Sequence, residues 1–99
     1  MNSVSLAGVV TELAALRYTP AGIPLISFTL KHVSQRTEAG MLRQVECEVP
    51  AVVMAKLAEQ ARDLRVGHHA RVEGFLAKKS LNSRQLILHI NALEIIEKG

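Results

Sequence analysis

Apolar and polar residues alternate along most of this chain of 99 residues, and the alternation breaks once. A period of two is typical of strands that bury one face and expose the other. We therefore predict five strands, at residues 3–17, 23–34, 41–49, 70–79 and 85–96. In residues 51–65 the apolar side chains are spaced by three or four, which predicts an amphipathic helix that Gly67 ends.

The alternation also predicts which side chains face the core. Pro50 should end the third strand, because proline has no N–H for a central ladder. Cys47, in that strand, is expected to be a small buried hydrophobe. The predicted inward residues are Val4, Leu6, Gly8 and Val10, then Ile26, Phe28 and Leu30, then Val45, Cys47 and Val49.

Turn residues and two glycines complete the fold prediction. The segment Thr19-Pro20-Ala21-Gly22 suits a type I turn, 38–40 marks a reversal, and 80–84 is expected to be a hairpin tip. Gly8 and Gly74, inside strands, suggest bends that let a strand turn a barrel corner. The order of elements predicts a mainly β, five-stranded Greek-key barrel of the oligonucleotide/oligosaccharide-binding (OB) fold, with one helix between strands three and four. An unspecified α+β domain is the alternative.

Size and composition limit the class of protein. A chain of this length has room for one domain, residues 1–99. Its single cysteine rules out an internal disulfide and a Cys-rich zinc site. No apolar run approaches the roughly 18 residues of a membrane span, and the first residues lack a signal-peptide pattern, so we expect a cytoplasmic protein. The mean hydropathy of +0.18 favours apolar surface hidden in an oligomer.

Positive charge is concentrated in the second half of the chain. The net charge is +3, and residues 1–50 carry four basic and four acidic side chains. Residues 51–99 carry eight basic side chains against five acidic ones, which supplies the whole excess. Lys78, Lys79 and Arg84 form a cluster without an acid in the predicted hairpin tip. The cluster is either a solvated tip or a site for a polyanion.

Several segments, taken in order, resemble a known family. They cover nearly the whole chain, with nearly the spacing found in bacterial single-stranded-DNA-binding domains. The resemblance is closest to the PriB-like family, that of primosomal replication protein N. The segments are Leu6-Ala7-Gly8-Val9-Val10, residues 17–24, Phe28-Thr29-Leu30-Lys31-His32, Ala39-Gly40, Arg43-Gln44, Cys47, Pro50, Val72-Glu73-Gly74-Phe75 and Leu88-His89.

This resemblance implies a homodimer that binds single-stranded DNA. It also implies that the protein helps the PriA helicase and the DnaT protein to reload the replicative helicase at stalled forks. The family's basic DNA contacts correspond to Arg17, Arg43, Lys78, Lys79 and Arg84. In an OB fold the binding surface comprises strands two and three and the loops after strands one and four. We therefore expect these side chains to converge on one side.

Few aromatic side chains are available for stacking on bases. Tyr18, beside Arg17, is the best candidate, whereas Phe28 and Phe75 are expected to be packed. Met41 and Glu46 stand where the best-known family member has aromatic residues, and an outward Glu46 would repel phosphates. We expect weakly selective, strongly salt-dependent binding that relies mainly on phosphate contacts.

Other functions are weighed against this one. A protein-interaction adaptor that kept the fold but lost most nucleic-acid affinity is the main alternative, and an RNA-binding cold-shock barrel ranks lower because its strand aromatics are missing. His68 and His69 are adjacent, so in a strand they point to opposite faces and chelate one ion poorly. No motif for catalysis occurs, and we predict no enzyme activity, metal or cofactor.

Overall fold

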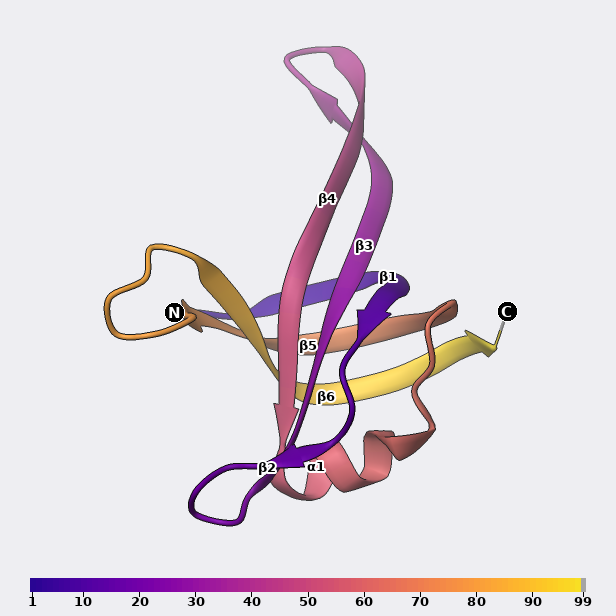
Figure 1. Ribbon diagram of the computed structural model, residues 1–99. Helices are drawn as coiled ribbons and strands as arrows, with labels where there is room; N and C mark the ends of the chain where they lie inside the picture. Colours follow the sequence, from indigo (N-terminus) through magenta and orange to yellow (C-terminus); the bar gives the residue numbers. More distant parts are fainter. Residues whose placement is uncertain (99) are drawn as a thin grey trace.

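The computed structural model describes residues 1–98, and it consists of six strands and two short helices (Figure 1). No helix in this part of the chain has the length and apolarity to cross a membrane. The elements are β1 (Val4–Leu13), β2 (Arg17–Tyr18), β3 (Pro24–Glu38), β4 (Met41–Met54), α1 (Ala55–Gln60), the 3-10 helix η1 (Ala61–Asp63), β5 (His68–Lys78) and β6 (Leu86–Lys98).

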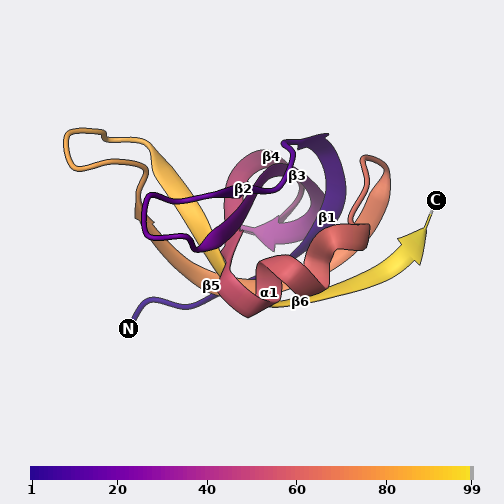
Figure 2. The ribbon, with the colours of Figure 1, turned by 60° about the horizontal axis from the view of Figure 1, so that its bottom comes forward.

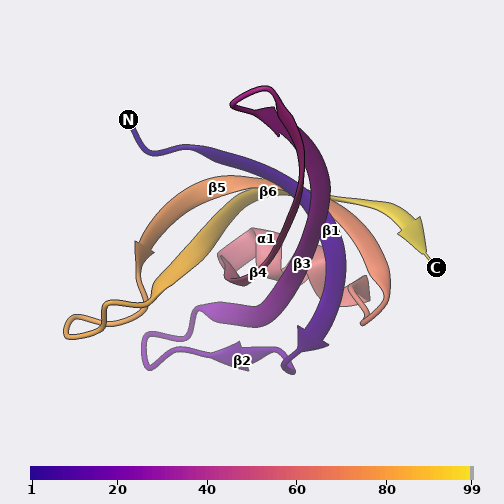
Figure 3. The ribbon, with the colours of Figure 1, turned by 90° about the horizontal axis from the view of Figure 1, so that it is seen from above.

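The five long strands close into a barrel. The strand order is β1-β5-β6-β4-β3-β2, and an additional pairing of β1 with β3 closes the ring. All pairs are antiparallel except β4 with β6. The helix α1 packs against β3, β4 and β6 and lies across one end of the barrel (Figures 2 and 3). The predicted OB barrel, with its helix after the third long strand, is confirmed.

Gly8 and Gly74 lie where two backbones approach each other closely. A Cβ at Gly8 would collide with the carbonyl oxygen of Lys31, and a Cβ at Gly74 would collide with that of His89. β1 changes partner just after Gly8, from β5 to β3 at Val9. The ladder between β5 and β6 shifts register beside Gly74. Both glycines therefore lie at barrel corners, as their positions inside strands predict.

The barrel core contains most of the side chains that alternation predicts for the first two long strands. Ile26, Phe28 and Leu30 are all buried, as is Val10, whereas Val4 and Leu6 are half-buried and pack against the core. The rest of the core comes from β4, the helices, β5 and β6: Ala51, Val53, Ala58, Ala61, Leu64, Ala70, Val72, Leu88 and Ile90.

The boundary between β4 and the helix is a correction to the sequence-based expectation. β4 continues through Pro50 to Met54, and the helix begins at Ala55 rather than Ala51. A short run of buried apolar residues such as 51–53 is compatible with a strand as well as a helix. β6 neighbours β4 only at Ala51 and Val52, so at Pro50 one side of β4 is open and the missing N–H need not break a ladder.

Cys47 is also a correction, because its side chain is exposed rather than buried. The hairpin of β3 and β4 extends well beyond the barrel (Figure 1), so its outer part has no core beneath it. On that part Val45 and Val49 are only half-buried. β3 itself reaches Glu38, four residues further than the predicted end at Ser34.

Candidate nucleic-acid interface

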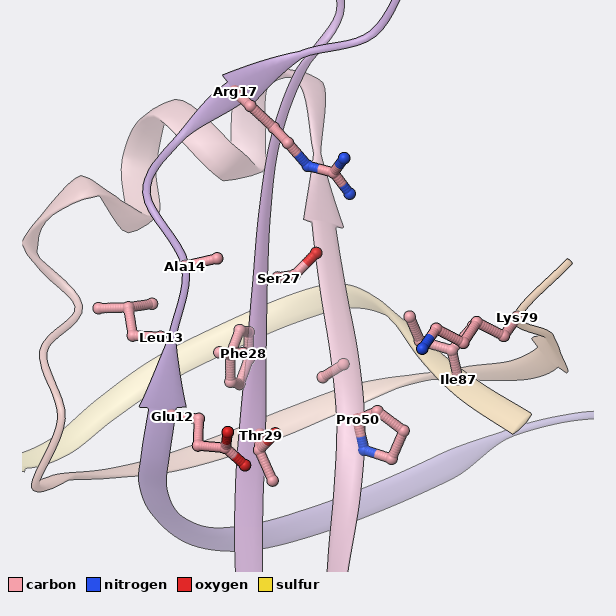
Figure 4. A pocket seen from close by; sticks show the side chains of 11 residues that line it. Glu12, Leu13, Ala14, Arg17, Ser27, Phe28, Thr29, Pro50, Lys79 and Ile87 are labelled. Atoms are coloured by element: carbon pink, nitrogen blue, oxygen red, sulfur yellow. The ribbon is translucent and has the colours of Figure 1, made fainter. Parts of the chain in front are cut away.

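An open groove of about 470 Å³ lies where the end of β1, β2, β3, β4, the start of β6 and the loop after β5 come together. Arg17 from β2 and Lys79 from that loop both line it (Figure 4). Its lining residues are Glu12, Leu13, Ala14, Arg17, Ser27, Phe28, Thr29, Pro50, Ala51, Lys79 and Ile87. The groove therefore has a basic side chain on each of two walls that are far apart in sequence.

Arg17 is held by a short ladder and a tight turn. β2 pairs with the start of β3, with Arg17 opposite Leu25 and Tyr18 opposite Pro24. The predicted turn at 19–22 is present, since the Gly22 N–H donates to the Thr19 carbonyl oxygen at 2.8 Å. Tyr18 is 60% exposed beside this turn, so its ring is accessible as the stacking prediction requires.

The second basic wall is the loop between β5 and β6. Its base is closed by the Lys79 N–H, which donates to the Gln85 carbonyl oxygen at 2.8 Å. Lys78, the last residue of β5, and Arg84, on the loop, are exposed but do not line the groove. This loop and the turn after β2 project on the same side of the barrel in all three ribbon views. Arg17, Tyr18, Lys78, Lys79 and Arg84 are thus brought to one side.

Arg43 lies elsewhere, two residues from the start of β4 at the tip of the β3–β4 hairpin, and it does not line the groove. Its Nη1 atom contacts Glu38 Oε1 at 2.6 Å, so a neighbouring carboxylate offsets its charge. The tip is the predicted reversal, where Ala39 and Gly40 both have positive φ angles. The structure does not bring Arg43 together with the other predicted contacts.

The acidic residues of this region have different surroundings. Glu46 forms an ion pair with Lys31, with 3.3 Å between Oε1 and Nζ, so its repulsion of phosphates is partly offset. Glu12 lines the groove itself and was not singled out by the sequence. Among the side chains that the structure describes, none of Arg17, Lys78, Lys79 and Arg84 forms an ion pair.

Phe75 is exposed, contrary to the expectation that it is packed. Its side chain is 42% exposed, and its ring stacks on His89 of β6 with centroids 5.1 Å apart and planes 7° from parallel. The inward alternation of Val72, Gly74 and Leu76 was the signal that could have placed Phe75 on the outer face.

The histidines have separate environments. The His32 Nδ1–H donates to the Ala7 carbonyl oxygen at 2.6 Å, and the buried His68 accepts a hydrogen bond at Nδ1 from the Arg65 N–H at 3.1 Å. Within residues 1–96, whose side chains the structure describes, no three His, Cys, Asp or Glu are grouped as metal ligands.

A five-stranded closed barrel with a basic groove beside β3 and β4 defines the chain as an OB-fold protein of the kind that binds extended polymers. Residues 2–92 match the model of a family described as another single-strand binding protein family, and the chain belongs to that family. This membership confirms the expectation of a binding protein rather than an enzyme.

Relatives in the family share about two fifths of the sequence. The replication restart protein PriB of Nitrosomonas europaea is 41% identical over 95 residues, which are 96% of this chain and 88% of the relative. PriB of Neisseria meningitidis serogroup B is also 41% identical, over 94% of this chain and 92% of the relative. The resemblance drawn from the sequence segments is therefore confirmed.

Solved structures agree with the fold. PriB from Ralstonia solanacearum superimposes with a TM-score of 0.87 and 33% identity, covering 98% of this chain and 99% of that one. The single-stranded DNA binding protein from Thermus aquaticus gives a TM-score of 0.81 at 24% identity, covering 99% of this chain and 51% of that one. The second likeness supports the barrel alone.

Proposed function

We propose that this chain is a single-stranded DNA-binding accessory protein of the primosome, which acts in replication restart and helicase reloading in the cytoplasm. The observation that carries the proposal is the groove with Arg17 and Lys79 on its two walls, on a barrel of a single-strand binding family. Relatives named replication restart protein PriB support the biological role.

The proposed mechanism is electrostatic and involves no catalysis. Arg17 and Lys79 contact phosphates in the groove, while Lys78 at the end of β5 and Arg84 on the loop after β5 extend the basic track. Tyr18 offers an exposed ring for a base at the same end. Arg43 contacts DNA only if the strand continues along the β3–β4 hairpin to its tip. Phosphate contacts carry little sequence information, so binding should be weakly selective.

We further propose that the whole chain, 1–99, works as one domain and forms a homodimer through the open edge of β1. β1 pairs with β5 from Val4 to Val9, and β3 joins its other side only at Val9. In the segment before Val9, the N–H and C=O groups on the side away from β5 therefore have no neighbouring strand. A strand of a second copy can pair with such an edge. Exposed Val33, Met41 and Leu42 on the projecting hairpin add apolar surface for a partner copy to cover.

A dimer would place two basic grooves on one assembly, which raises the effective concentration of each groove for a strand held by the other. By family resemblance, the PriA helicase and DnaT are the proposed protein partners.

The proposal is tested by fluorescence anisotropy of a labelled thymidine oligonucleotide at low and at physiological salt, with a duplex as control. The expected result is preference for the single strand and a log–log salt slope between about −2 and −4, at roughly −0.7 per phosphate. Arg17→Ala should reduce that slope. Arg62→Ala, which removes the same charge from an exposed position on η1 outside the groove, should leave it unchanged.

The second candidate function, a protein-interaction adaptor, is favoured by the carboxylates near the basic side chains. Glu12 lines the groove, and the ion pairs of Lys31 and Arg43 offset two further positive charges. Absence of single-strand binding even at low salt would reject the DNA-binding proposal in favour of the adaptor.

A further inference from the structure

The Phe75–His89 stack lies on the same face of the sheet as the floor of the groove. Val52 pairs with Ser27 of β3 on one side and with His89 of β6 on the other, and His89 pairs with Phe75 of β5. Ser27 lines the groove. Since residues directly opposite in neighbouring strands share a face, Ser27, Val52, His89 and Phe75 form one row across four strands.

The row lies outside the barrel rather than in its core. Val52 lies between Ala51 and Val53, which both belong to the core cluster, so alternation turns Val52 outward, where its neighbours leave it only 4% exposed. Gly74 and Leu88, the chain neighbours of Phe75 and His89, are buried on the inner side. The next row on this face contains Ala77 and Ile87, which are paired, and Ile87 lines the groove. The outer face of the sheet that forms the groove floor therefore continues in register from β3 and β4 onto β6 and β5, and Ile87 of β6 is the point at which the groove reaches it.

We propose that Phe75 and His89 form a base-stacking platform that extends the DNA path out of the groove. The inference rests on the proposed single-strand binding and adds the site at which one or more bases stack. Neighbouring strands are about 4.8 Å apart, so three steps take the path roughly 14 Å from Ser27 to Phe75, a span that a few nucleotides cover.

The geometry of the stack suits a base. The two rings are nearly parallel, and each uses only one of its faces for the other. A flat base can continue such a stack, because base–aromatic stacking needs only an accessible π-face and tolerates any base. Phe75 is 42% exposed, which provides that access.

The platform matters because the chain has few other aromatic side chains on which a base could stack. The chain has no tryptophan, one tyrosine and two phenylalanines, and Phe28 is buried in the core. Tyr18 and Phe75 are thus its exposed aromatic side chains of these types, and Tyr18 lies beside Arg17 while Phe75 lies at the end of the row that starts at Ser27. A DNA strand whose phosphates are bound between these two residues could stack one base on Tyr18 and another on Phe75.

The first test uses the absence of native tryptophan. Phe75→Trp introduces a single indole, whose emission should be quenched when oligothymidylate binds, because a stacked base quenches it. Ile96→Trp is the matched control, since Ile96 is 45% exposed on β6 but seven residues beyond His89. Its emission should not change on binding. Quenching of neither variant at saturating DNA, with binding confirmed by anisotropy, would overturn the platform.

The second test separates stacking from phosphate contacts. Phe75→Leu keeps an apolar side chain but removes the ring, and it should weaken binding about tenfold at every salt concentration without changing the salt slope. With an abasic oligonucleotide, wild type and Phe75→Leu should bind equally. Thermal melting of the variant checks that the exposed substitution leaves the fold intact.

The outcomes distinguish the platform from the function on which it rests. Suppose that Phe75→Leu binds DNA with wild-type affinity while the salt slope of Arg17→Ala is smaller in magnitude. The DNA-binding proposal then stands and the platform is rejected. An aromatic pair that docks a protein partner, or that only stabilises the sheet, would give that same unchanged DNA affinity. If wild type itself does not bind single strands, both proposals fail.

Discussion

At the scale of single residues, the absence of a side chain matters as much as its presence. Gly8 and Gly74 are the positions where a strand passes close to a neighbouring carbonyl, and both were recognised from the sequence. The sequence could mark them because glycine within an alternating run is costly unless the backbone needs the space. What it could not show is which backbone lies opposite.

Gly8→Ala should destabilise the fold, because its Cβ would meet the Lys31 carbonyl oxygen and force the β1–β3 corner apart. We expect a loss of about 1–3 kcal/mol in the free energy of unfolding, the usual cost of overpacking. For a domain of this size each kcal/mol lowers Tm by about 4–8 °C. Thermal unfolding followed by circular dichroism measures the change.

The matched control is Ser5→Ala, at an exposed position on the same strand. It should change the free energy of unfolding by less than about 0.5 kcal/mol. A Gly8→Ala protein as stable as wild type would mean that the corner can open without cost.

At the scale of elements, the end of β5 and the loop after it carry three of the predicted DNA contacts, Lys78, Lys79 and Arg84, but only Lys79 lines the groove. A net count of positive charge cannot distinguish these residues. Successive strand residues point to opposite faces, so Lys78 and Lys79 are directed differently where β5 ends. The relative contributions of the loop residues therefore depend on the course of the DNA.

The salt dependence of two loop variants measures those contributions. Each phosphate contact accounts for roughly −0.7 of the log–log slope. Lys79→Ala should therefore reduce the magnitude of the slope by about 0.7. The triple change of Lys78, Lys79 and Arg84 to alanine should reduce it by about 2 if all three contact phosphates.

Anisotropy titrations at four or more salt concentrations give these slopes. If the triple variant reduces the magnitude of the salt slope no more than Lys79→Ala does, the phosphate contact is restricted to the groove. Unchanged affinity in the triple variant would remove the loop from the interface altogether.

At the scale of the whole molecule, the projecting β3–β4 hairpin dominates the shape. The molecule measures 50 by 36 by 21 Å, and its radius of gyration of 14.4 Å exceeds the roughly 13 Å of a compact domain of this length. A projecting arm with exposed Val33, Met41 and Leu42 is more typical of a subunit in an oligomer than of a monomeric protein.

The open edge of β1 gives a prediction about assembly. The Ala7 carbonyl oxygen accepts a hydrogen bond from His32 of β3, so the backbone groups of Ala7 point away from β5. Ser5, two residues earlier, points the same way. Ser5→Pro removes an N–H from that edge, and a proline is tolerated at an edge.

Light scattering should therefore show wild type at about twice the 10.8 kDa of one chain, and Ser5→Pro at about one chain. Ser5→Ala, which keeps the N–H, should remain dimeric. A wild-type protein that is monomeric at micromolar concentration would contradict the dimer, and a dimeric Ser5→Pro protein would place the interface away from this edge.

The features that depend on a local pattern could be predicted from the sequence alone. Alternation and glycine placement predicted the number and order of the long strands, the barrel corners and the inward residues Ile26, Phe28 and Leu30. The sequence also identified Arg17 and Lys79 as basic side chains near strand ends. These inferences succeed because the period of a strand is a property of a few consecutive residues.

What each face of a strand contacts, in contrast, depends on how the chain folds. Cys47 has the parity of a core residue but lies on an arm without a core beneath it, and Phe75 lies outside the barrel against His89. Residues 51–53 are buried in β4 rather than in a helix because β3 pairs with all three and β6 pairs with Ala51 and Val52. Arg43 is separated from Arg17 by the length of the hairpin. Burial and convergence depend on contacts between distant segments, and a local pattern carries no record of those contacts.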